Sequence, residues 1–152
     1  MMASGITGFG SSQIPAPIQG EVMEIREVLP KSNKKEITTK TITVEEYIRN
    51  YFSDIPVLVE VARCESQFRQ HDKYGNILRG VVNNLDLGVM QINEYYHEHD
   101  SDKLGYDIST IEGNTAYARH LYEKSGLKPW KSSSPCWSKT TAYTEHQALA
   151  MK

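Results

Sequence analysis

Glu65 is the residue of this sequence best placed for acid–base chemistry. It continues an apolar stripe formed by Leu58, Val61 and Ala62, with the spacing of one helix face, and it falls near the expected end of that helix. Burial and the negative end of the helix dipole both disfavour an ionised carboxylate, so we expect a raised pKa for Glu65. A carboxyl group that stays protonated can donate a proton to a glycosidic oxygen. From position alone, an exposed carboxylate at a helix end is the alternative.

Two helices are expected to position this residue. Thr43 to Glu46 has the Ser/Thr-x-x-Glu form of a capping box, and it predicts a helix over about residues 44–52. Ser53 or Asp54 is expected to cap the next helix, the one that carries Glu65, with Pro56 in its first turn.

The middle of the chain has a different pattern. Between Phe68 and Gly88 the helical period is lost, and the residues predict a turn at Tyr74–Asn76 followed by a short extended segment at Ile77–Val82. Leu87–Asn93 is apolar and fits either a strand or a helix. We therefore expect a small β region here.

Helical spacing returns in the second half. One helix is predicted around Glu94–Lys103, and a second capping box at Ser109–Glu112 opens another helix that ends at Gly126 as its C′ residue. The expected fold class is α+β and mainly helical.

The chain is expected to have three parts. Residues 1–42 are interpreted as a flexible leader or linker, 43–137 as the folded domain and 138–152 as a C-terminal tail. Met1–Gly20 contains no charged residue and is rich in Gly, Ser, Pro and Ala, with few large apolar side chains. It lacks the basic and apolar regions of a secretory signal as written.

Three segments resemble the transglycosylase SLT domain family in order and spacing: Ala62–Phe68, Gly88–Asn93 and Asn114–Tyr122. The signature of this family is a Glu-Ser pair that closes a helix, a later Gly-Leu-Met-Gln segment, and a helix with a Tyr or Asn that faces the cleft. The resemblance covers about residues 55–137 and implies a goose-type lysozyme-like fold. The family's usual Ala-Tyr-Asn-Ala-Gly segment is replaced here by Gly126–Trp130.

A second resemblance concerns the C-terminal part of the domain. Cys64 directly before the glutamate, and Pro129-Trp130 followed by Cys136, are similar to resuscitation-promoting-factor domains, which share the lysozyme-like fold. Both resemblances imply the same substrate, the glycan strands of peptidoglycan.

The resemblance to the SLT family implies roles for individual residues. Glu65 would be the catalytic acid, and Met90 would belong to the core. The implied substrate-binding residues are Ser66, Gly88, Gln91, Asn93 and Tyr117. Turn formation is the alternative role for Gln91 and Asn93, and core packing is the alternative for Tyr117.

The resemblance implies a lytic transglycosylase, which cleaves the β-1,4 bond between N-acetylmuramic acid and N-acetylglucosamine with one acid. In that reaction the C6 hydroxyl of the sugar attacks C1, and no cofactor is expected. A muramidase that hydrolyses the same bond is the alternative; it needs a second carboxylate, and Asp86 is the nearest one. A glycan-binding module without activity is the other alternative.

The two cysteines allow a disulfide between Cys64 and Cys136, worth roughly 4 kcal/mol in the chain-entropy account. Two unrelated buried thiols are the alternative. A disulfide would place the protein in an extracytoplasmic compartment, such as the periplasm, the cell wall or the medium. The His97–Asp100 segment is polar, but no paired cysteines accompany it, so no metal site is expected.

Composition limits the partners. The 152 residues include 17 Lys and Arg against 19 Asp and Glu, a net charge of −2 that gives no broad positive field for nucleic acid. The longest apolar stretch, around Val57–Ala62, already contains Glu60 and is too short to span a membrane. We expect a monomer. Five aromatic residues could stack on sugar rings, although a core or interface position is the favoured interpretation for each taken singly: Tyr95, Tyr96, Tyr106, Trp130 and Trp137.

Overall fold

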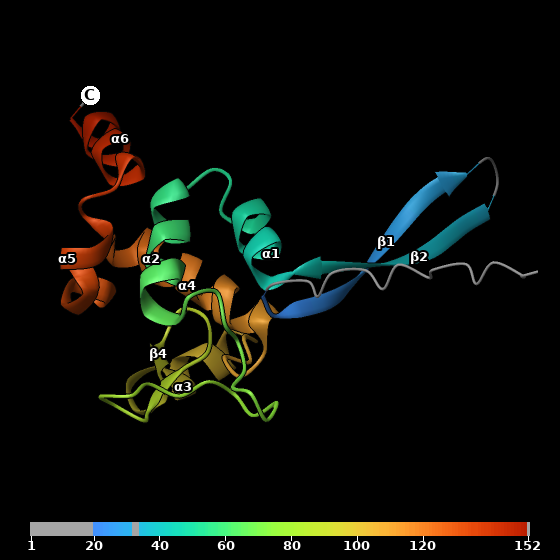
Figure 1. The fold of residues 1–152 in the computed structure, drawn as a ribbon, viewed down its shortest axis with the longest axis horizontal. Helices are drawn as coiled ribbons and strands as arrows, with labels where there is room; N and C mark the ends of the chain where they lie inside the picture. Colours follow the sequence, from blue (N-terminus) through green and yellow to red (C-terminus); the bar gives the residue numbers. More distant parts are fainter. Residues whose placement is uncertain (1–19, 32–33, 152) are drawn as a thin grey trace, which may run out of the picture.

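The computed structural model describes residues 20–31 and 34–151 (Figure 1). Most of the leader predicted at the N-terminus, residues 1–19, lies outside the described residues. The fold is α+β and mainly helical, as predicted. Its elements are β1 (Val22–Lys31), β2 (Lys34–Thr43), α1 (Val44–Tyr51), α2 (Pro56–Ser66), β3 (Asp86–Leu87), β4 (Ile92–Asn93), α3 (Glu94–Lys103), α4 (Ile111–Ser125), the 3₁₀ helix η1 (Lys128–Ser133), α5 (Ser134–Trp137) and α6 (Thr141–Ala150).

One hydrophobic core joins α1, α2, the β3–β4 turn, α4 and η1. The apolar stripe of α2 points into it, since Leu58, Val61 and Ala62 have no exposed surface. Met90 is also fully buried, as the resemblance implied. Glu65 is in line with this stripe but one turn nearer the helix end, where it is only partly buried. The stripe therefore orients the helix so that its last turn presents a carboxyl group at the edge of the core.

The helix starts follow the predictions in part. Thr43 caps α1 as predicted, because its hydroxyl oxygen accepts a hydrogen bond from the Glu46 N–H at 3.0 Å. The predicted cap of α2 is wrong: the N-cap is Ile55, without a side-chain hydrogen bond. Asp54 instead accepts two hydrogen bonds of 2.8 Å from Arg119 of α4. Asp54 therefore forms a long-range ion pair with Arg119 instead of capping α2.

The cap of α4 is shifted by one residue from the prediction. Thr110, rather than Ser109, accepts the hydrogen bond from the Gly113 N–H, at 3.1 Å. Ser109 is engaged elsewhere, since its hydroxyl donates to Asp107 at 2.6 Å. The helix ends at Ser125, and the glycine predicted to follow its end, Gly126, is the C-cap rather than the C′ residue. Its φ of 63° is one that glycine adopts readily, and its N–H donates to the Tyr122 carbonyl at 2.7 Å.

The β region next to α2 is smaller than predicted. The strands β3 and β4 pair antiparallel over two residues each, with Asp86 opposite Asn93 and Leu87 opposite Ile92. The segment expected to be extended, residues 77–82, forms only isolated bridges, at Ile77 and Arg79. The predicted turn at 74–76 is present, closed by the Gly75 N–H to the Asp72 carbonyl at 3.1 Å.

Two fully buried amide side chains hold the tight turn between β3 and β4. Gln70 accepts the Val89 N–H at 2.9 Å, and Asn114 accepts the Met90 N–H at 2.9 Å. Gly88 lies between these amides with a φ of 68°, and a Cβ on it would fall 2.7 Å from Gln70 Oε1. Buried side chains therefore fix the conformation of the turn, and the turn fixes the positions of Asp86 in β3 and Asn93 in β4.

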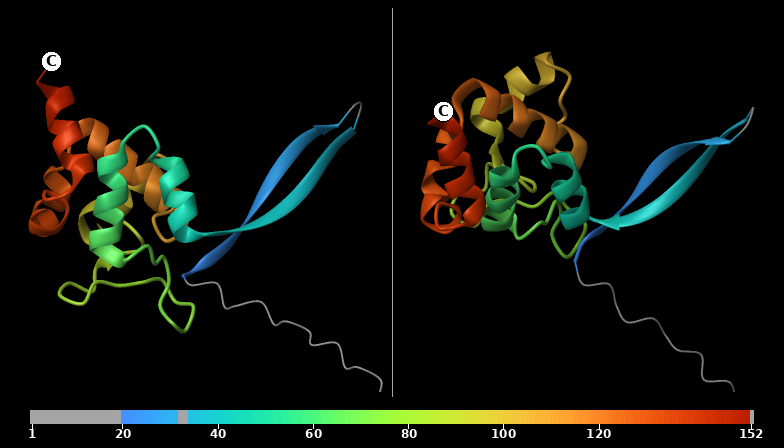
Figure 2. Two further views of the ribbon diagram at one scale, coloured as in Figure 1. Left: turned by 45° about the horizontal axis from the view of Figure 1, so that its top comes forward. Right: turned by 90° about the horizontal axis from the view of Figure 1, so that it is seen from above.

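A β-hairpin that the sequence analysis did not predict precedes the helices. The strands β1 and β2 pair from Val22–Thr43 to Lys31–Lys34, and the hairpin extends away from the helical body (Figures 1 and 2). Its second strand is rich in Thr and Ile, residues that favour strands. This segment belongs to residues 1–42, interpreted from sequence as a flexible leader or linker, but its described part forms two paired strands.

The segment expected to be a C-terminal tail contains the helix α6, which packs against α2. Tyr143 of α6 contacts Trp137 edge to face, with 5.3 Å between the ring centroids. Among the described residues, none of the helices has both the length and the apolar character needed to cross a bilayer.

Candidate active site

A cavity of about 250 Å³ opens at the end of α2. Glu65 lines it from α2, and Asp86, Gln91 and Asn93 line it from the β3–β4 hairpin. Ile92 of β4 also lines it, and the remaining walls come from α3, α4 and η1: Tyr96, His97, Leu121, Pro129, Trp130 and Ser132. Residues far apart in the chain thus meet around one carboxyl group.

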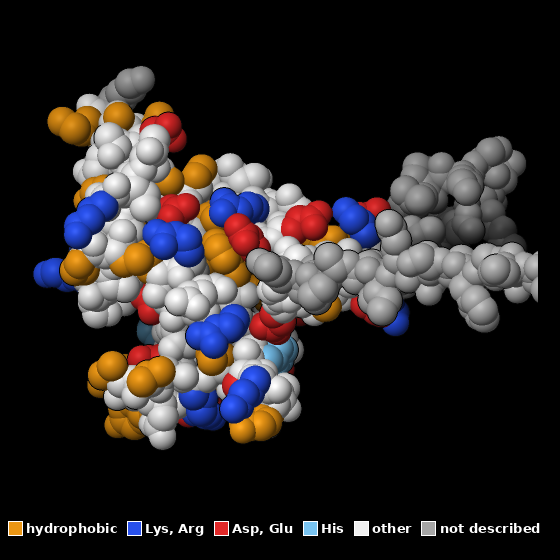
Figure 3. All heavy atoms as spheres, in the orientation of Figure 1, with side chains coloured by type: hydrophobic (Ala, Val, Ile, Leu, Met, Phe, Trp, Pro, Cys, Tyr) orange, Lys and Arg blue, Asp and Glu red, His pale blue; other side chains and the backbone are white. Residues whose placement is uncertain are grey.

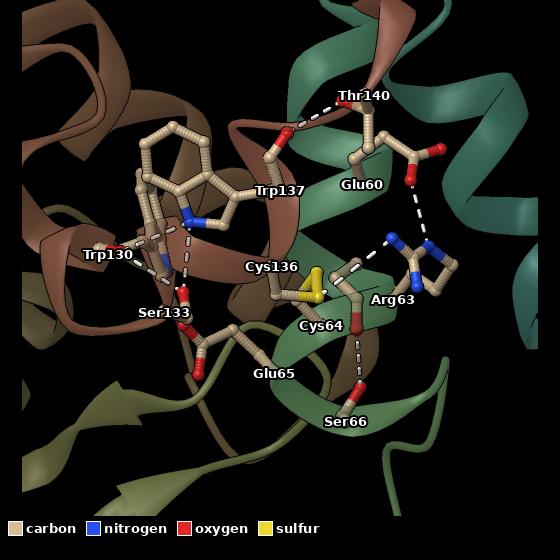
Figure 4. Close-up of a disulfide and its surroundings, with 11 residues drawn as sticks. Glu60, Arg63, Cys64, Glu65, Ser66, Trp130, Ser133, Cys136, Trp137 and Thr140 are labelled. Atoms are coloured by element: carbon tan, nitrogen blue, oxygen red, sulfur yellow. Dashed lines mark hydrogen bonds and ion pairs between the residues drawn. A yellow bond between two sulfur atoms is a disulfide. The ribbon is translucent and has the colours of Figure 1, made fainter. Parts of the chain in front are cut away.

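Glu65 is held by a serine that the sequence analysis did not identify (Figure 4). The Ser133 hydroxyl donates to Glu65 Oε1 at 2.6 Å, closer than the 3.1 Å to the Trp130 carbonyl oxygen. Trp137 Nε1–H donates to the Ser133 oxygen at 3.0 Å. The Ser133 oxygen thus accepts a hydrogen bond from the indole, while its own O–H is available to donate to the Glu65 carboxyl group, the nearer of its two acceptors.

The surroundings of Glu65 favour its neutral form. Burial raises the pKa of Glu65 above its ordinary value, and the nearby negative charge of Asp86 raises it further. The hydrogen bond from Ser133 acts in the opposite direction and lowers the pKa, because it stabilises the carboxylate. The net pKa shift is upward, in the direction expected from the sequence.

Asp86 is the second carboxylate of the cavity, and amide groups hold it. Its Oδ1 accepts hydrogen bonds from Asn93 Nδ2 at 2.6 Å and from Asn83 Nδ2 at 3.2 Å. Two amide donors thus fix the position of this carboxyl group. The cavity therefore contains two carboxyl groups, one held by a serine hydroxyl and the other by amide side chains.

Two of the residues implied as substrate contacts lie in the cavity beside Glu65. Gln91 Nε2 donates to the Gly88 carbonyl at 2.8 Å, which orients the side chain, and its backbone φ is 50°. Asn93 has a dual role, because it donates to Asp86 and also caps α3 by accepting the Tyr96 N–H at 3.3 Å. Both side chains thus take part in turn and cap structure as well as lining the cavity.

The other three residues implied as substrate contacts, Ser66, Gly88 and Tyr117, do not line the cavity. Ser66 is buried, donates to the Ala62 carbonyl at 3.1 Å and accepts the Arg69 N–H at 3.2 Å. Gly88 is buried against Gln70 and Asn114. Tyr117 is 2% exposed, and its hydroxyl lies 3.2 Å from His97 Nδ1. In this structure Ser66 and Gly88 shape the backbone beneath the site, and Tyr117 supports His97, which does line it.

The aromatic candidates for sugar stacking occupy different settings. Tyr96 lines the cavity and is 72% exposed, and Tyr95 beside it is equally open to solvent. Trp130 lines the cavity but is almost completely buried, and Trp137 is buried behind it. Tyr106 packs against the core. Tyr96 is therefore the aromatic side chain best placed to contact a ligand in the cavity.

The disulfide between Cys64 and Cys136 is present (Figure 4), with 6.1 Å between the two Cα atoms. It joins the last turn of α2 to α5 beside Glu65. This bond explains how Ser133 could have been found from sequence. Cys64 precedes Glu65 and Ser133 lies three residues before Cys136, so a bridge between the cysteines brings the serine near the acid.

Other hollows and polar clusters do not reproduce this arrangement. A hollow of about 600 Å³ lies between residues 20–21 and the loop after α2, but both of its acids accept backbone N–H groups. Glu21 accepts those of Gln70 and His71 at 2.7 and 3.1 Å, and Asp72 accepts those of Tyr74 and Asn76 at 2.8 and 2.9 Å. Within the described residues, no group of three His, Cys, Asp or Glu side chains could hold a metal ion, and the 97–100 segment forms none.

No protein-family model, curated protein or solved structure matches this chain.

Proposed function

We propose that this chain cleaves the β-1,4 bond between N-acetylmuramic acid and N-acetylglucosamine in peptidoglycan, with Glu65 as the proton donor. The observation that carries the proposal is a partly buried glutamate with a raised pKa in a cavity lined by polar side chains. Gln91, which lines the same cavity, offers amide groups of the kind that bind N-acetyl and hydroxyl groups. The disulfide is compatible with an extracytoplasmic location, where this substrate is found.

The reaction we place first is that of a lytic transglycosylase. Protonated Glu65 donates its proton to the leaving glycosidic oxygen as the bond to C1 breaks. The C6 hydroxyl of the same N-acetylmuramic acid residue attacks C1, and the Glu65 carboxylate takes the proton that this hydroxyl loses. The product is a 1,6-anhydromuramyl end, and no water is consumed. Because the attacking group is tethered to the reacting ring, proximity replaces the activation of water.

Hydrolysis of the same bond is the second candidate, and the position of Asp86 favours it. This carboxylate lines the same cavity as Glu65 and is held by Asn93 and Asn83. A muramidase needs such a second carboxylate, either to activate water or to attack C1. In the hydrolytic reaction the product carries a reducing end and gains one oxygen from water.

The products distinguish the two reactions. If the chain is a transglycosylase, digestion of purified peptidoglycan in ¹⁸O-water is expected to release anhydromuropeptides without label, seen by mass spectrometry. Reducing ends that carry the label would favour hydrolysis, and Asp86→Asn should then abolish their release. Binding to peptidoglycan without any released product would favour a non-catalytic module and would contradict the proposal.

The hydrogen bond from Ser133 leads to an expected pH effect. Ser133→Ala removes a contact that lowers the pKa of Glu65, so the pKa should rise further and the protonated acid should persist to higher pH. The alkaline limb of the profile of kcat/KM against pH should therefore move to higher pH. Ser133→Thr keeps the hydroxyl and should retain the wild-type limb. If both variants keep that limb, Ser133 does not tune Glu65.

A further inference from the structure

A second hollow of about 340 Å³ adjoins the active-site cavity. The two share Tyr96, His97 and Leu121 as walls, so they lie next to each other along α3 and α4. We call the second one the lysine hollow, because Lys103 of α3 and Lys124 of α4 line it. A branched ligand could place one part in each space.

The charges of the two spaces differ in sign. The active-site cavity has the carboxyl groups of Glu65 and Asp86, whereas the lysine hollow has two ammonium groups and a single carboxylate, Asp100. Over the described ranges, no carboxylate lies within ion-pair distance of either lysine. Positive and negative side chains are interspersed on the face drawn in Figure 3, and the chain as a whole has a net charge of −2. A hollow lined by two lysines and one carboxylate departs from this average.

His97, which separates the two spaces, is held in place by Tyr117, and nearby charges act on its pKa. The Tyr117 hydroxyl lies 3.2 Å from His97 Nδ1, and the ring of His120 stacks on Tyr117 with 5.7 Å between centroids. Burial lowers the pKa of His97; the charge of Asp100 opposes this shift, and the charge of Lys124, with a smaller effect, adds to it. The charges of α3 and α4 thus act at the same point, beside the cavity that contains Glu65.

We propose that the lysine hollow binds a carboxylate of the peptide stem carried by the N-acetylmuramic acid residue. The peptide branches from the sugar whose glycosidic bond is cleaved, and it bears free carboxylates that the acidic cavity would repel and the two lysines would attract. This inference rests on the proposed function, because it needs the sugar to occupy the adjacent cavity. The hollow would make the enzyme prefer peptide-bearing strands over bare glycan.

The first test compares substrates. The ratio of kcat/KM on peptide-bearing strands to kcat/KM on strands stripped by an amidase is measured for wild type and for the double variant Lys103→Gln/Lys124→Gln. The ratio is expected to fall about fivefold in this variant, since each exposed charge contact is weak. Lys128→Gln/Lys139→Gln removes the same charge from two exposed lysines outside both spaces and should keep the ratio. An equal ratio in all three proteins overturns the inference.

The second test does not depend on cleavage. An isolated stem peptide is titrated into ¹⁵N-labelled Glu65→Gln protein, and amide signals of residues 100–104 and 120–124 are expected to shift. The same peptide with its carboxyl groups amidated should leave them in place. If no form of the chain cleaves glycan but the peptide still shifts these signals, the proposed function fails and the binding site stands. If cleavage is found but the acidic peptide causes no shift, the binding site is wrong.

Discussion

Replacing Glu65 with Gln is expected to lower the rate of glycan cleavage by roughly a hundredfold to ten-thousandfold, the usual contribution of a positioned general acid. The substitution nearly preserves volume but removes the transferable proton. The hydrogen bond from Ser133 can still be accepted by the new amide oxygen. The measurement is the release of soluble muropeptides from purified peptidoglycan. Glu60→Gln is the matched control, because Glu60 lies on the same helix and pairs with Arg63 at 2.8 Å, away from the cavity.

Thermal melting across pH 4 to 8 checks that the loss is not one of folding. The pKa of Glu65 is raised in the folded state, so ionisation of this one group should cost wild type stability, relative to Glu65→Gln, as pH rises from the ordinary glutamate value of about 4.3 to the folded value. Glu65→Gln has no such loss and should gain stability relative to wild type over this range, with no difference well below it. Full activity in Glu65→Gln, or a stability difference that is constant with pH, would contradict the catalytic role.

Removing the disulfide is expected to produce the largest change in stability. The double variant Cys64→Ser/Cys136→Ser should lose up to about 4 kcal/mol of unfolding free energy, because the unfolded chain regains the freedom of a long loop. For a chain of this size that corresponds to roughly 10 °C in melting temperature. Activity should fall as well, because the same bond keeps the segment with Ser133 against Glu65. Calorimetry and muropeptide release measure the two effects.

Reducing the wild-type protein measures the loss of the disulfide without the effect of the two serine substitutions. Wild type treated with a phosphine reductant should melt near the temperature of the double variant, whereas the double variant itself should not respond to the reductant. If reduced and oxidised wild type melt together, the bridge contributes nothing to stability, and the segment from η1 to α5 is held by its packing alone.

Local patterns predicted the helices well because short-range rules govern them. The Thr43 cap of α1, the apolar stripe of α2 and the predicted bounds of α3 all correspond to the structure. The pattern also placed Glu65 at the edge of the core. The errors at the helix starts arose where side chains had partners elsewhere, as when Arg119 binds Asp54.

The site could be predicted only in part, because long-range contacts complete it. Ser133 lies far from Glu65 in the chain, and only the pairing of Cys64 with Cys136 indicates that the two residues meet. Gln70 and Asn114 are polar residues whose burial is possible only because each pairs with backbone groups of the β3–β4 turn. The hairpin of β1 and β2 was missed for a different reason, since highly charged sequences of this kind are compatible with both a strand and a linker.

All residues that line the active-site cavity lie between Cys64 and Cys136 in the chain, so the disulfide encloses them in one covalent ring. A protease that cuts one peptide bond in this ring, for example at the fully exposed Val81–Val82 pair, leaves both pieces covalently attached. The walls of the cavity then stay tethered to each other. The β1–β2 hairpin lies outside the ring, so a single cut between it and α1 leaves it without a covalent link to the helical body. Proteolysis thus affects the two parts of the molecule differently. After one cut inside the ring, the walls of the cavity remain covalently linked, whereas after one cut before α1 only non-covalent contacts hold the hairpin.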